Sequence, residues 1–177
     1  MNYKLPKTST INFKNKFINL LWYFINTFIF PLSLRSNSLR RILLRLFGAK
    51  ISKNSRISRL CKIEYPYNLT MGENSSIGNY CYILGLDKID IGSNVCISDN
   101  VAILAGGHKL NSNDFDLLTR PIKIMDNVWV AYGSIINPGV TISEGSVVLA
   151  GSVVASSIES MSIFGGNPAS FIKKRKL

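Results

Sequence analysis

Aliphatic residues recur at every sixth position along most of the chain. The longest series runs from Ile124 to Val154 without a break, and three shorter series start at positions 51, 71 and 91. An amphipathic helix would need apolar spacings of three and four, and a half-buried strand would alternate at every second position. The pattern therefore predicts a repeat structure. Its sixth-place residues are Ile51, Ile57, Ile63, Met71, Ile77, Ile83, Ile91, Ile97, Ile103, Ile124, Val130, Ile136, Ile142, Val148 and Val154.

A small or apolar residue stands four places after many of these aliphatic residues, as at Cys61, Cys81 and Val101. Such hexads fit a triangular solenoid, in which each hexad gives one short strand and one corner and three hexads complete a coil. Stacked coils pair as parallel strands about 4.8 Å apart, with the aliphatic residues in ladders inside. The expected fold class is therefore an all-β solenoid of about five coils. We expect the coils at 51–70, 71–90, 91–123, 124–141 and 142–159.

The six-residue spacing is interrupted once, between Ile103 and Ile124, and the only histidine of the chain, His108, lies in this interruption. A regular step needs six residues, so about fifteen residues are additional, and loops of this length are usually functional or disordered. We expect an extruded loop over about 104–123. Three segments follow: 1–50 before the solenoid, 51–160 with the solenoid and its loop, and 161–177 as a C-terminal segment with a basic tail.

The first 50 residues differ in pattern. Residues 14–30 are apolar nearly all round and are followed by Pro31, which predicts a helix, and residues 38–50 predict a short amphipathic basic helix. The first helix is marginal in length for spanning a bilayer, and the small-residue cleavage site of a signal peptide is missing. Two interpretations stay open: residues 1–50 cap the open edge of the solenoid, or they anchor the protein to a membrane surface.

The charge of the chain is unevenly distributed. Residues 1–63 contain 13 Lys or Arg and no Asp or Glu, whereas residues 64–172 contain 4 basic and 10 acidic residues. The net charge of +11 therefore belongs to the N-terminal segment and the tail. Basic segments of this kind bind nucleic acids or anionic membranes. Because no nucleic-acid-binding motif is present, the membrane surface is favoured over nucleic acid.

The three cysteines, Cys61, Cys81 and Cys96, form no CxxC pair. This argues against a zinc site and a disulfide scaffold and favours a reducing compartment. Cys61 and Cys81 stand one coil apart in the same inward position, so we expect buried packing thiols.

Together, the hexads, the loop GGHKLNSNDFDLLTRPIKI, the run NVWVAYGSIINPGVTI and the ending FGGNPASFIKKR resemble the left-handed β-helix acyltransferases. The resemblance covers roughly residues 38–177 and is strongest to the acetyl-CoA-dependent O-acetyltransferases of colanic-acid and exopolysaccharide biosynthesis. It implies a left-handed parallel β-helix, a homotrimer with active sites between subunits, acetyl-CoA as acyl donor and no metal. A γ-carbonic anhydrase-like solenoid is rejected, because it needs three histidines for its metal.

By this resemblance, His108 is the catalytic base. Acetyl transfer from a thioester to a hydroxyl needs a base for the hydroxyl proton, alignment of the two substrates and a donor for the oxyanion. A neutral imidazole suits the first task near pH 7. The chain has no GxSxG motif and no cysteine beside the histidine in sequence, which favours direct transfer in a ternary complex over a covalent intermediate.

The resemblance also assigns a coenzyme site along the C-terminal coils, where small residues let a thin chain lie against the backbone. Tyr132 departs from the glycine of many relatives, and Ala155-Ser156 replaces their Thr-Lys, which puts side-chain contacts in doubt. The basic tail is assigned to the adenine and 3′-phosphate. The expected coenzyme-binding residues are Ala131, Tyr132, Gly133, Ala150, Gly151, Ala155, Ser156, Asn167, Pro168, Ser170, Lys173, Lys174 and Arg175.

The sequence identifies the acceptor-binding residues less clearly, because the asparagine that relatives place in the coil before the loop is missing. The candidate acceptor residues are Tyr82, Gly85, Asp87, Asp114 and Trp129. The expected function is O-acetylation of a bacterial surface or exopolysaccharide glycan or its precursor, in the cytoplasm or peripherally at the cytoplasmic face of the inner membrane. Three alternatives stay open: N-acetylation of a nucleotide amino sugar, acetylation of another small acceptor, and a non-catalytic structural solenoid.

Overall fold

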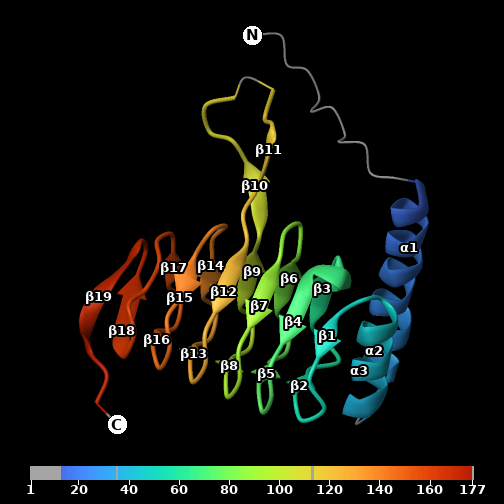
Figure 1. The fold of residues 1–177 in the computed structure, drawn as a ribbon, viewed down its shortest axis with the longest axis horizontal. Helices are drawn as coiled ribbons and strands as arrows, with labels where there is room; N and C mark the ends of the chain where they lie inside the picture. Colours follow the sequence, from blue (N-terminus) through green and yellow to red (C-terminus); the bar gives the residue numbers. More distant parts are fainter. Residues whose placement is uncertain (1–12, 35, 113, 177) are drawn as a thin grey trace.

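Three parallel sheets form the walls of a triangular solenoid (Figure 1). The structure is a computed structural model that describes residues 13–34, 36–112 and 114–176. Sheet A contains β1 (Lys50–Ile51), β4 (Leu69–Met71), β7 (Ile89–Ile91), β12 (Ile122–Ile124) and β15 (Thr141–Ile142). Sheet B contains β2 (Arg56–Ile57), β5 (Ser76–Ile77), β8 (Cys96–Ile97), β13 (Trp129–Val130), β16 (Val147–Val148), β18 (Ser162–Gly166) and β19 (Ala169–Lys174). Sheet C contains β3 (Lys62–Glu64), β6 (Tyr82–Leu84), β9 (Ala102–Leu104), β14 (Ile135–Ile136) and β17 (Val153–Val154).

The predicted ladders form the interior. Ile57, Ile77 and Ile97 stand in register on successive strands of sheet B, and all three are buried. Cys61 and Cys81 are buried in the same inward column, as predicted. Where serine takes the inward corner position, its hydroxyl donates to a backbone carbonyl, so no buried polar side-chain atom of the described residues lacks a partner. The solenoid prediction and its ladders are confirmed.

The solenoid has about six turns rather than five. Five coils are complete, and a partial sixth begins with a bridge between Ile142 and Ile158 and continues as β18, which pairs with β16. The step from Val154 to Ile158 is four residues instead of six, which is why the six-residue spacing missed this turn. The hairpin of β18 and β19 ends the solenoid and covers its last coil.

Helices cover the opposite end of the solenoid (Figure 1). The first helical segment comprises α1 (Phe13–Phe24), a π-helical stretch (Ile25–Ile29) and α2 (Phe30–Leu32), and α3 spans Asn37–Leu46. Both predicted helices are present, but their ends differ from the prediction. The first continues one residue past Pro31, within the usual uncertainty of helix ends. The second was expected over 38–50 but ends at Leu46, because Gly48 with a φ of +91° follows it and β1 begins at Lys50. Ser36 accepts a hydrogen bond from the Leu39 N–H at the start of α3. None of the helices in the described ranges is both long and apolar enough to cross a membrane.

Polar side chains of the helices pair with the exposed edges of the first coil. Asn26 donates to the Cys61 carbonyl at 3.3 Å and accepts from the Ile63 N–H at 2.9 Å, which completes the edge of β3. Asn37 pairs with the edge of β2 in the same way: it donates to the Ser55 carbonyl and accepts from the Ile57 N–H. An unpaired strand edge is a template for aggregation. The capping interpretation of the N-terminal segment is therefore confirmed for its described residues.

Three stacks of corners join the sheets. The corner between sheets B and C consists of residues 58–61, 78–81, 98–101, 131–134 and 149–152. The corner between sheets A and B consists of residues 52–55, 72–75, 92–95, 125–128, 143–146 and 159–161. The corner between sheets C and A consists of residues 65–68, 85–88, 105–121, 137–140 and 155–157.

The predicted loop leaves the third coil at the corner between sheets C and A. It is an antiparallel hairpin of β10 (Gly106–His108) and β11 (Leu117–Thr119), which stands out from the solenoid wall (Figure 1). A Cβ at Gly106 would approach the Leu86 side chain to 2.6 Å, so the base of the hairpin packs closely on the coil before it.

Candidate functional site

The ring of His108 is oriented by the backbone on the other side of the hairpin. Its Nδ1 lies 2.6 Å from the carbonyl oxygen of Phe115. A carbonyl oxygen only accepts hydrogen bonds, so Nδ1 carries the proton that it donates, and Nε2 of the neutral ring keeps its lone pair. The His108 side chain is exposed, so this lone pair can receive a proton from a ligand.

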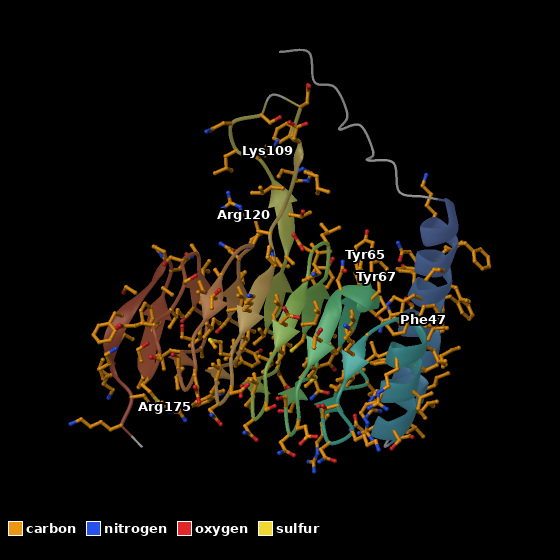
Figure 2. All side chains as sticks on the ribbon, viewed as in Figure 1. Phe47, Tyr65, Tyr67, Lys109, Arg120 and Arg175 are labelled. Atoms are coloured by element: carbon orange, nitrogen blue, oxygen red, sulfur yellow. The ribbon has the colours of Figure 1, made fainter. Side chains whose placement is uncertain are left out.

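Further contacts hold the hairpin in shape around His108. The Lys109 N–H donates to the Asp116 carbonyl at 2.9 Å, and the side chains of the same two residues form an exposed ion pair at 3.7 Å. The Ser112 hydroxyl accepts from the N–H groups of Asp114 and Asp116. Asp114, a predicted acceptor residue, is exposed on this hairpin, so the structure brings it into the same segment as His108. Figure 2 shows Lys109 on the hairpin, well clear of the coils.

The first group of predicted coenzyme residues stacks at the corner between sheets B and C. Ala131, Tyr132 and Gly133 form this corner in the fourth coil, and Ala150 and Gly151 form it in the fifth. The Gly151 N–H donates to the Tyr132 carbonyl at 2.8 Å, which joins the two levels. Gly133 and Gly151 have φ of +67° and +69°, and a Cβ built on either would meet no atom within 4 Å. The small residues therefore leave open space beside the backbone.

The second group divides between another corner of the solenoid and the C-terminal turn. Ala155 and Ser156 are exposed at the corner between sheets C and A, the same stack of corners from which the hairpin leaves. Asn167 and Pro168 form the turn between β18 and β19, joined by a cis peptide bond. Ser170 follows in β19 beside Gly165. The turn continues the stack around Gly133, because the Gly166 N–H donates to the Ser152 hydroxyl at 3.2 Å, at the corner between sheets B and C. Within one chain, Ala155 and Ser156 do not join this stack.

The basic tail runs back to the corner between sheets A and B. Arg175 donates to the carbonyl oxygens of Asn127 and Gly145, at 3.1 and 2.8 Å, and Lys174 forms an ion pair with Glu159 at 3.0 Å. In Figure 2, Arg175 lies on the side of the solenoid away from the hairpin. These two cations thus have structural partners, whereas Lys173 is exposed and makes no ion pair among the described residues.

Three of the predicted acceptor residues lie on the second coil. The Tyr82 hydroxyl donates to Glu64 Oε1 at 3.0 Å, and burial together with this carboxylate raises the pKa of Tyr82 to about 12. Gly85 is buried against the backbone of the first coil, where a Cβ would lie 3.0 Å from the Glu64 carbonyl oxygen. Asp87 accepts from the Lys88 N–H at 2.7 Å. Gly85 therefore has a packing role, while the Tyr82 hydroxyl keeps its proton at neutral pH and donates it to Glu64, so its oxygen can accept from a ligand.

Trp129 lies apart from these residues, on the outer face of sheet B. Its indole N–H donates to the Ser98 hydroxyl at 3.0 Å, and the residue remains 45% exposed. Sheet B, and not the hairpin corner, thus presents this ring to any ligand or neighbouring chain.

A cleft of about 440 Å³ between α1 and β3 holds residues that the sequence patterns did not single out. Glu64 lies there beside Lys62, 3.1 Å from its Nζ, and Lys62 also lies over the Tyr82 ring at 5.2 Å. Tyr65 and Trp22 complete the lining near this cluster. Glu64 is the first carboxylate of the chain, a sequence signal that could have drawn attention to it. In the described ranges, no three His, Cys, Asp or Glu residues come together as a metal site.

Known proteins of similar sequence and structure are acetyltransferases. A protein named as a colanic acid biosynthesis acetyltransferase, WcaF of Escherichia coli K12, is 38% identical over 156 residues, which are 88% of this chain and 86% of that protein. A maltose O-acetyltransferase structure from Clostridium difficile 630 is 31% identical, with a TM-score of 0.83 over 95% of this chain and 91% of that one. A hexapeptide-repeat acetyltransferase of Vibrio cholerae, solved with acetyl coenzyme A, is 25% identical, with a TM-score of 0.80 over 95% and 92% of the chains.

No family model matches the chain. The coverage of these relatives nevertheless includes the solenoid, the hairpin and part or all of the helical end, so the likeness is not confined to the repeats. The chain belongs to the hexapeptide-repeat acetyltransferase family.

Proposed function

We propose that this protein is an acetyl-CoA-dependent O-acetyltransferase that acetylates a sugar hydroxyl of a bacterial surface or exopolysaccharide glycan, or of its precursor. The contact between His108 Nδ1 and the Phe115 carbonyl is the observation that carries the proposal. It fixes the neutral tautomer with a free Nε2 lone pair, which is what a general base needs.

In the proposed reaction, His108 Nε2 takes the proton of the acceptor hydroxyl while the hydroxyl oxygen attacks the thioester carbonyl carbon. The tetrahedral oxyanion then collapses, the carbon–sulfur bond breaks, and the proton passes to the leaving thiolate. The products are the acetyl ester and free coenzyme A. The exposed cysteine Cys96 lies on sheet B and not on the hairpin, so direct transfer is favoured over an acetyl-cysteine intermediate.

The proposed donor site is the corner between sheets B and C. Open space outside Gly133 and Gly151 suits the thin pantetheine arm, and Ala131, Tyr132 and Ala150 are the side chains beside it. Ala155 and Ser156 are proposed to line the same site from a different chain, because within one chain they lie at another corner.

For the 3′-phosphate and adenine we propose the C-terminal turn and tail. Ser170 and Lys173 are the strongest candidates, since Lys174 and Arg175 already have structural partners. Asn167 and Pro168 shape the turn that precedes them. A lysine ammonium is a suitable point charge for a phosphate.

Within one chain, the proposed base and the proposed donor site lie at different corners of the solenoid. His108 leaves the corner between sheets C and A, whereas Gly133 lies at the corner between sheets B and C, so the width of sheet C lies between them. The outer face of sheet C carries Leu104, Ile135 and Val153, which are only partly buried in the chain. We therefore propose a homotrimer in which sheet C is covered and the hairpin of one subunit reaches the donor site of the next.

The proposed acceptor contacts are Tyr82, Asp87 and Asp114, and Glu64 and Lys62 of the cleft lie beside Tyr82. Hydroxyl, carboxylate and ammonium groups in a partly apolar cleft are suited to a polyhydroxylated ligand. Trp129 is proposed to face the neighbouring subunit or the coenzyme rather than the acceptor, because it projects from sheet B.

The proposed place of work is the cytoplasm, at the membrane face that carries glycan precursors. The N-terminal segment combines apolar residues with 13 basic and no acidic residues over positions 1–63. This composition favours peripheral contact with an anionic membrane through residues 1–50.

Binding and turnover together test the proposal. Acetyl-CoA at about 100 times its dissociation constant should stabilise the folded protein by ~2.7 kcal/mol, and dephospho-CoA should do so less. Release of coenzyme A should then require a sugar acceptor from a panel of mono- and disaccharides, with nucleotide amino sugars included. Stabilisation by neither coenzyme would reject the donor site, and turnover with amino sugars alone would replace O-acetylation by N-acetylation.

A further inference from the structure

The outer side of the helical end is apolar. Residues spaced by three or four along the first helical segment are buried on one side, as at Trp22 and Phe30, and exposed on the other. Leu20 is 67% exposed and Leu32 is 74% exposed, although both belong to helices that already cover the solenoid. Residues of this outer row are Phe17, Leu20, Leu21, Phe24, Phe28 and Leu32.

The last helix extends this surface. On α3, Leu44 is buried, while Leu39, Ile42 and Leu46 are exposed at spacings of three and four. Figure 2 shows side chains of the helices projecting away from the end of the solenoid. The two exposed rows define the cap face: Phe17, Leu20, Leu21, Phe24, Phe28, Leu32, Leu39, Ile42 and Leu46. An apolar surface of this extent on a soluble protein marks an interaction site.

Charges around the cap face indicate its partner. Exposed basic residues surround it on the helices and on the first coil, and residues 1–63 contain no Asp or Glu that could neutralise them. A second copy would bring the same positive charge against it, which like-charge repulsion opposes. An anionic lipid leaflet complements both the charge and the apolar rows. The exposed basic residues are Lys16, Arg45, Lys50, Lys53, Arg56, Arg59 and Lys62, of which Lys62 forms an ion pair with Glu64.

We propose that the cap face inserts its apolar rows into the interface of an anionic phospholipid leaflet, with the solenoid axis standing away from the membrane. This deepens the proposed peripheral contact and rests on that proposed function. Because the helices cover the end of the solenoid (Figure 1), insertion leaves all three sheets in water.

The proposed orientation also positions the base. The hairpin leaves the third coil, two coil spacings of about 4.8 Å each from the first. His108 would therefore act roughly 10 Å or more from the leaflet, at the level of sugars rather than lipid phosphates. In a cyclic trimer with solenoids side by side, three cap faces share one plane, and binding by three faces together is much tighter than by one.

Flotation of the full-length protein with vesicles tests the proposal. The protein should float with phosphatidylcholine vesicles that contain phosphatidylglycerol, and less with phosphatidylcholine alone or at high salt. Replacing Phe28 and Leu32, which are 55% and 74% exposed on the cap face, by serine should weaken flotation by at least about tenfold, because each apolar side chain loses its transfer energy. The matched control replaces Leu110 and Met125 by serine. These residues are 99% and 48% exposed and lie away from the cap face, so this variant should float normally.

Two double lysine-to-glutamine variants give the second comparison, which tests the contribution of positive charge near the cap face. Lys50→Gln with Lys53→Gln should weaken flotation several-fold, whereas Lys88→Gln with Lys123→Gln, on the second coil and on β12, should not. Thermal stabilisation by acetyl-CoA and turnover with soluble sugars should be unchanged in every variant, which separates failure of this proposal from failure of the proposed function. Three results would each overturn the membrane proposal. The first is no flotation of the wild-type protein, and the second is equal flotation of the Phe28/Leu32 variant. The third is a larger assembly of the wild-type protein that binds no vesicles and that the Phe28/Leu32 substitutions disperse.

Discussion

His108 and Phe115 face each other across the extruded hairpin, with the imidazole Nδ1 2.6 Å from the backbone carbonyl oxygen. The contact fixes both the tautomer and the direction of the ring. Because the acceptor is backbone, no side-chain substitution at position 115 removes it directly. The geometry of the base therefore depends on the hairpin pairing of β10 with β11.

Replacing His108 by alanine should lower kcat by ~10²–10⁴-fold, because the acceptor hydroxyl loses its general base. The dissociation constant of acetyl-CoA should change little, since the proposed donor site lies at another corner. Steady-state kinetics and calorimetry check the two parts. Leu110→Ala, on the same hairpin and 99% exposed, is the control and should keep its activity. An active His108→Ala enzyme would remove the histidine from the mechanism.

Replacing Tyr82 by phenylalanine should raise the KM for the sugar acceptor by several-fold and leave acetyl-CoA binding unchanged. The hydroxyl donates to Glu64, and its pKa of about 12 keeps it protonated at neutral pH. Loss of one such hydrogen bond is worth ~1–2 kcal/mol. Tyr80→Phe, an exposed neighbour, serves as the control. An unchanged KM for Tyr82→Phe would place the acceptor elsewhere.

Replacing Asn26 by alanine should lower the free energy of unfolding by ~1–3 kcal/mol, because a strand-edge N–H and a carbonyl lose their partner. Denaturant unfolding measures the loss. Thr27→Ala changes the exposed neighbouring side chain and should cost much less. If the two variants were equally stable, the amide would contribute nothing to the cap.

The free energy of unfolding should fall as the pH rises from about 9 towards 11. Burial raises the pKa of Cys81 from 9.0 to about 11, and burial together with the neighbouring Cys81 raises the pKa of Cys61 well above its usual value. The unfolded chain therefore loses these protons first, so the stability present below pH 9 is lost above it. Unfolding at several pH values should give a flatter slope for Cys61→Ala with Cys81→Ala, but not for Cys96→Ser. An unchanged slope in the double variant would contradict this.

The solenoid was predictable because one requirement repeats in every coil. Each inward position needs an aliphatic or small residue, so the ladder of Ile57, Ile77 and Ile97 is visible as spacing alone. The sixth turn was missed because the four-residue step to Ile158 departs from that spacing. The pairing of Asn26 and Asn37 with strand edges was also invisible, since it depends on how the helices dock and not on any local pattern.

The candidate site likewise has features that the sequence shows and features that only the structure shows. The interruption around His108 is a sequence feature, and its resemblance to known acyltransferases suggested the role. The tautomer, in contrast, depends on the hairpin register that brings Phe115 opposite the ring. The family resemblance, together with the charge of the tail, assigned Arg175 to the coenzyme, yet its guanidinium donates to two backbone carbonyls at the corner between sheets A and B. Such partners follow from the path of β19 and are absent from the sequence pattern.

The most direct measurement is complementation between two inactive variants. His108→Ala removes the proposed base, and Ala150→Trp should block the proposed donor site by filling the open space beside Gly151. Each variant alone should be inactive, and Lys53→Trp, at a corner of the first coil, should be active. Co-refolded mixtures should regain a measurable fraction of wild-type acetyl transfer, because some interfaces then pair an intact His108 with an intact donor corner. Mixtures as inactive as their parents, despite proven subunit exchange, would contradict a site shared between chains.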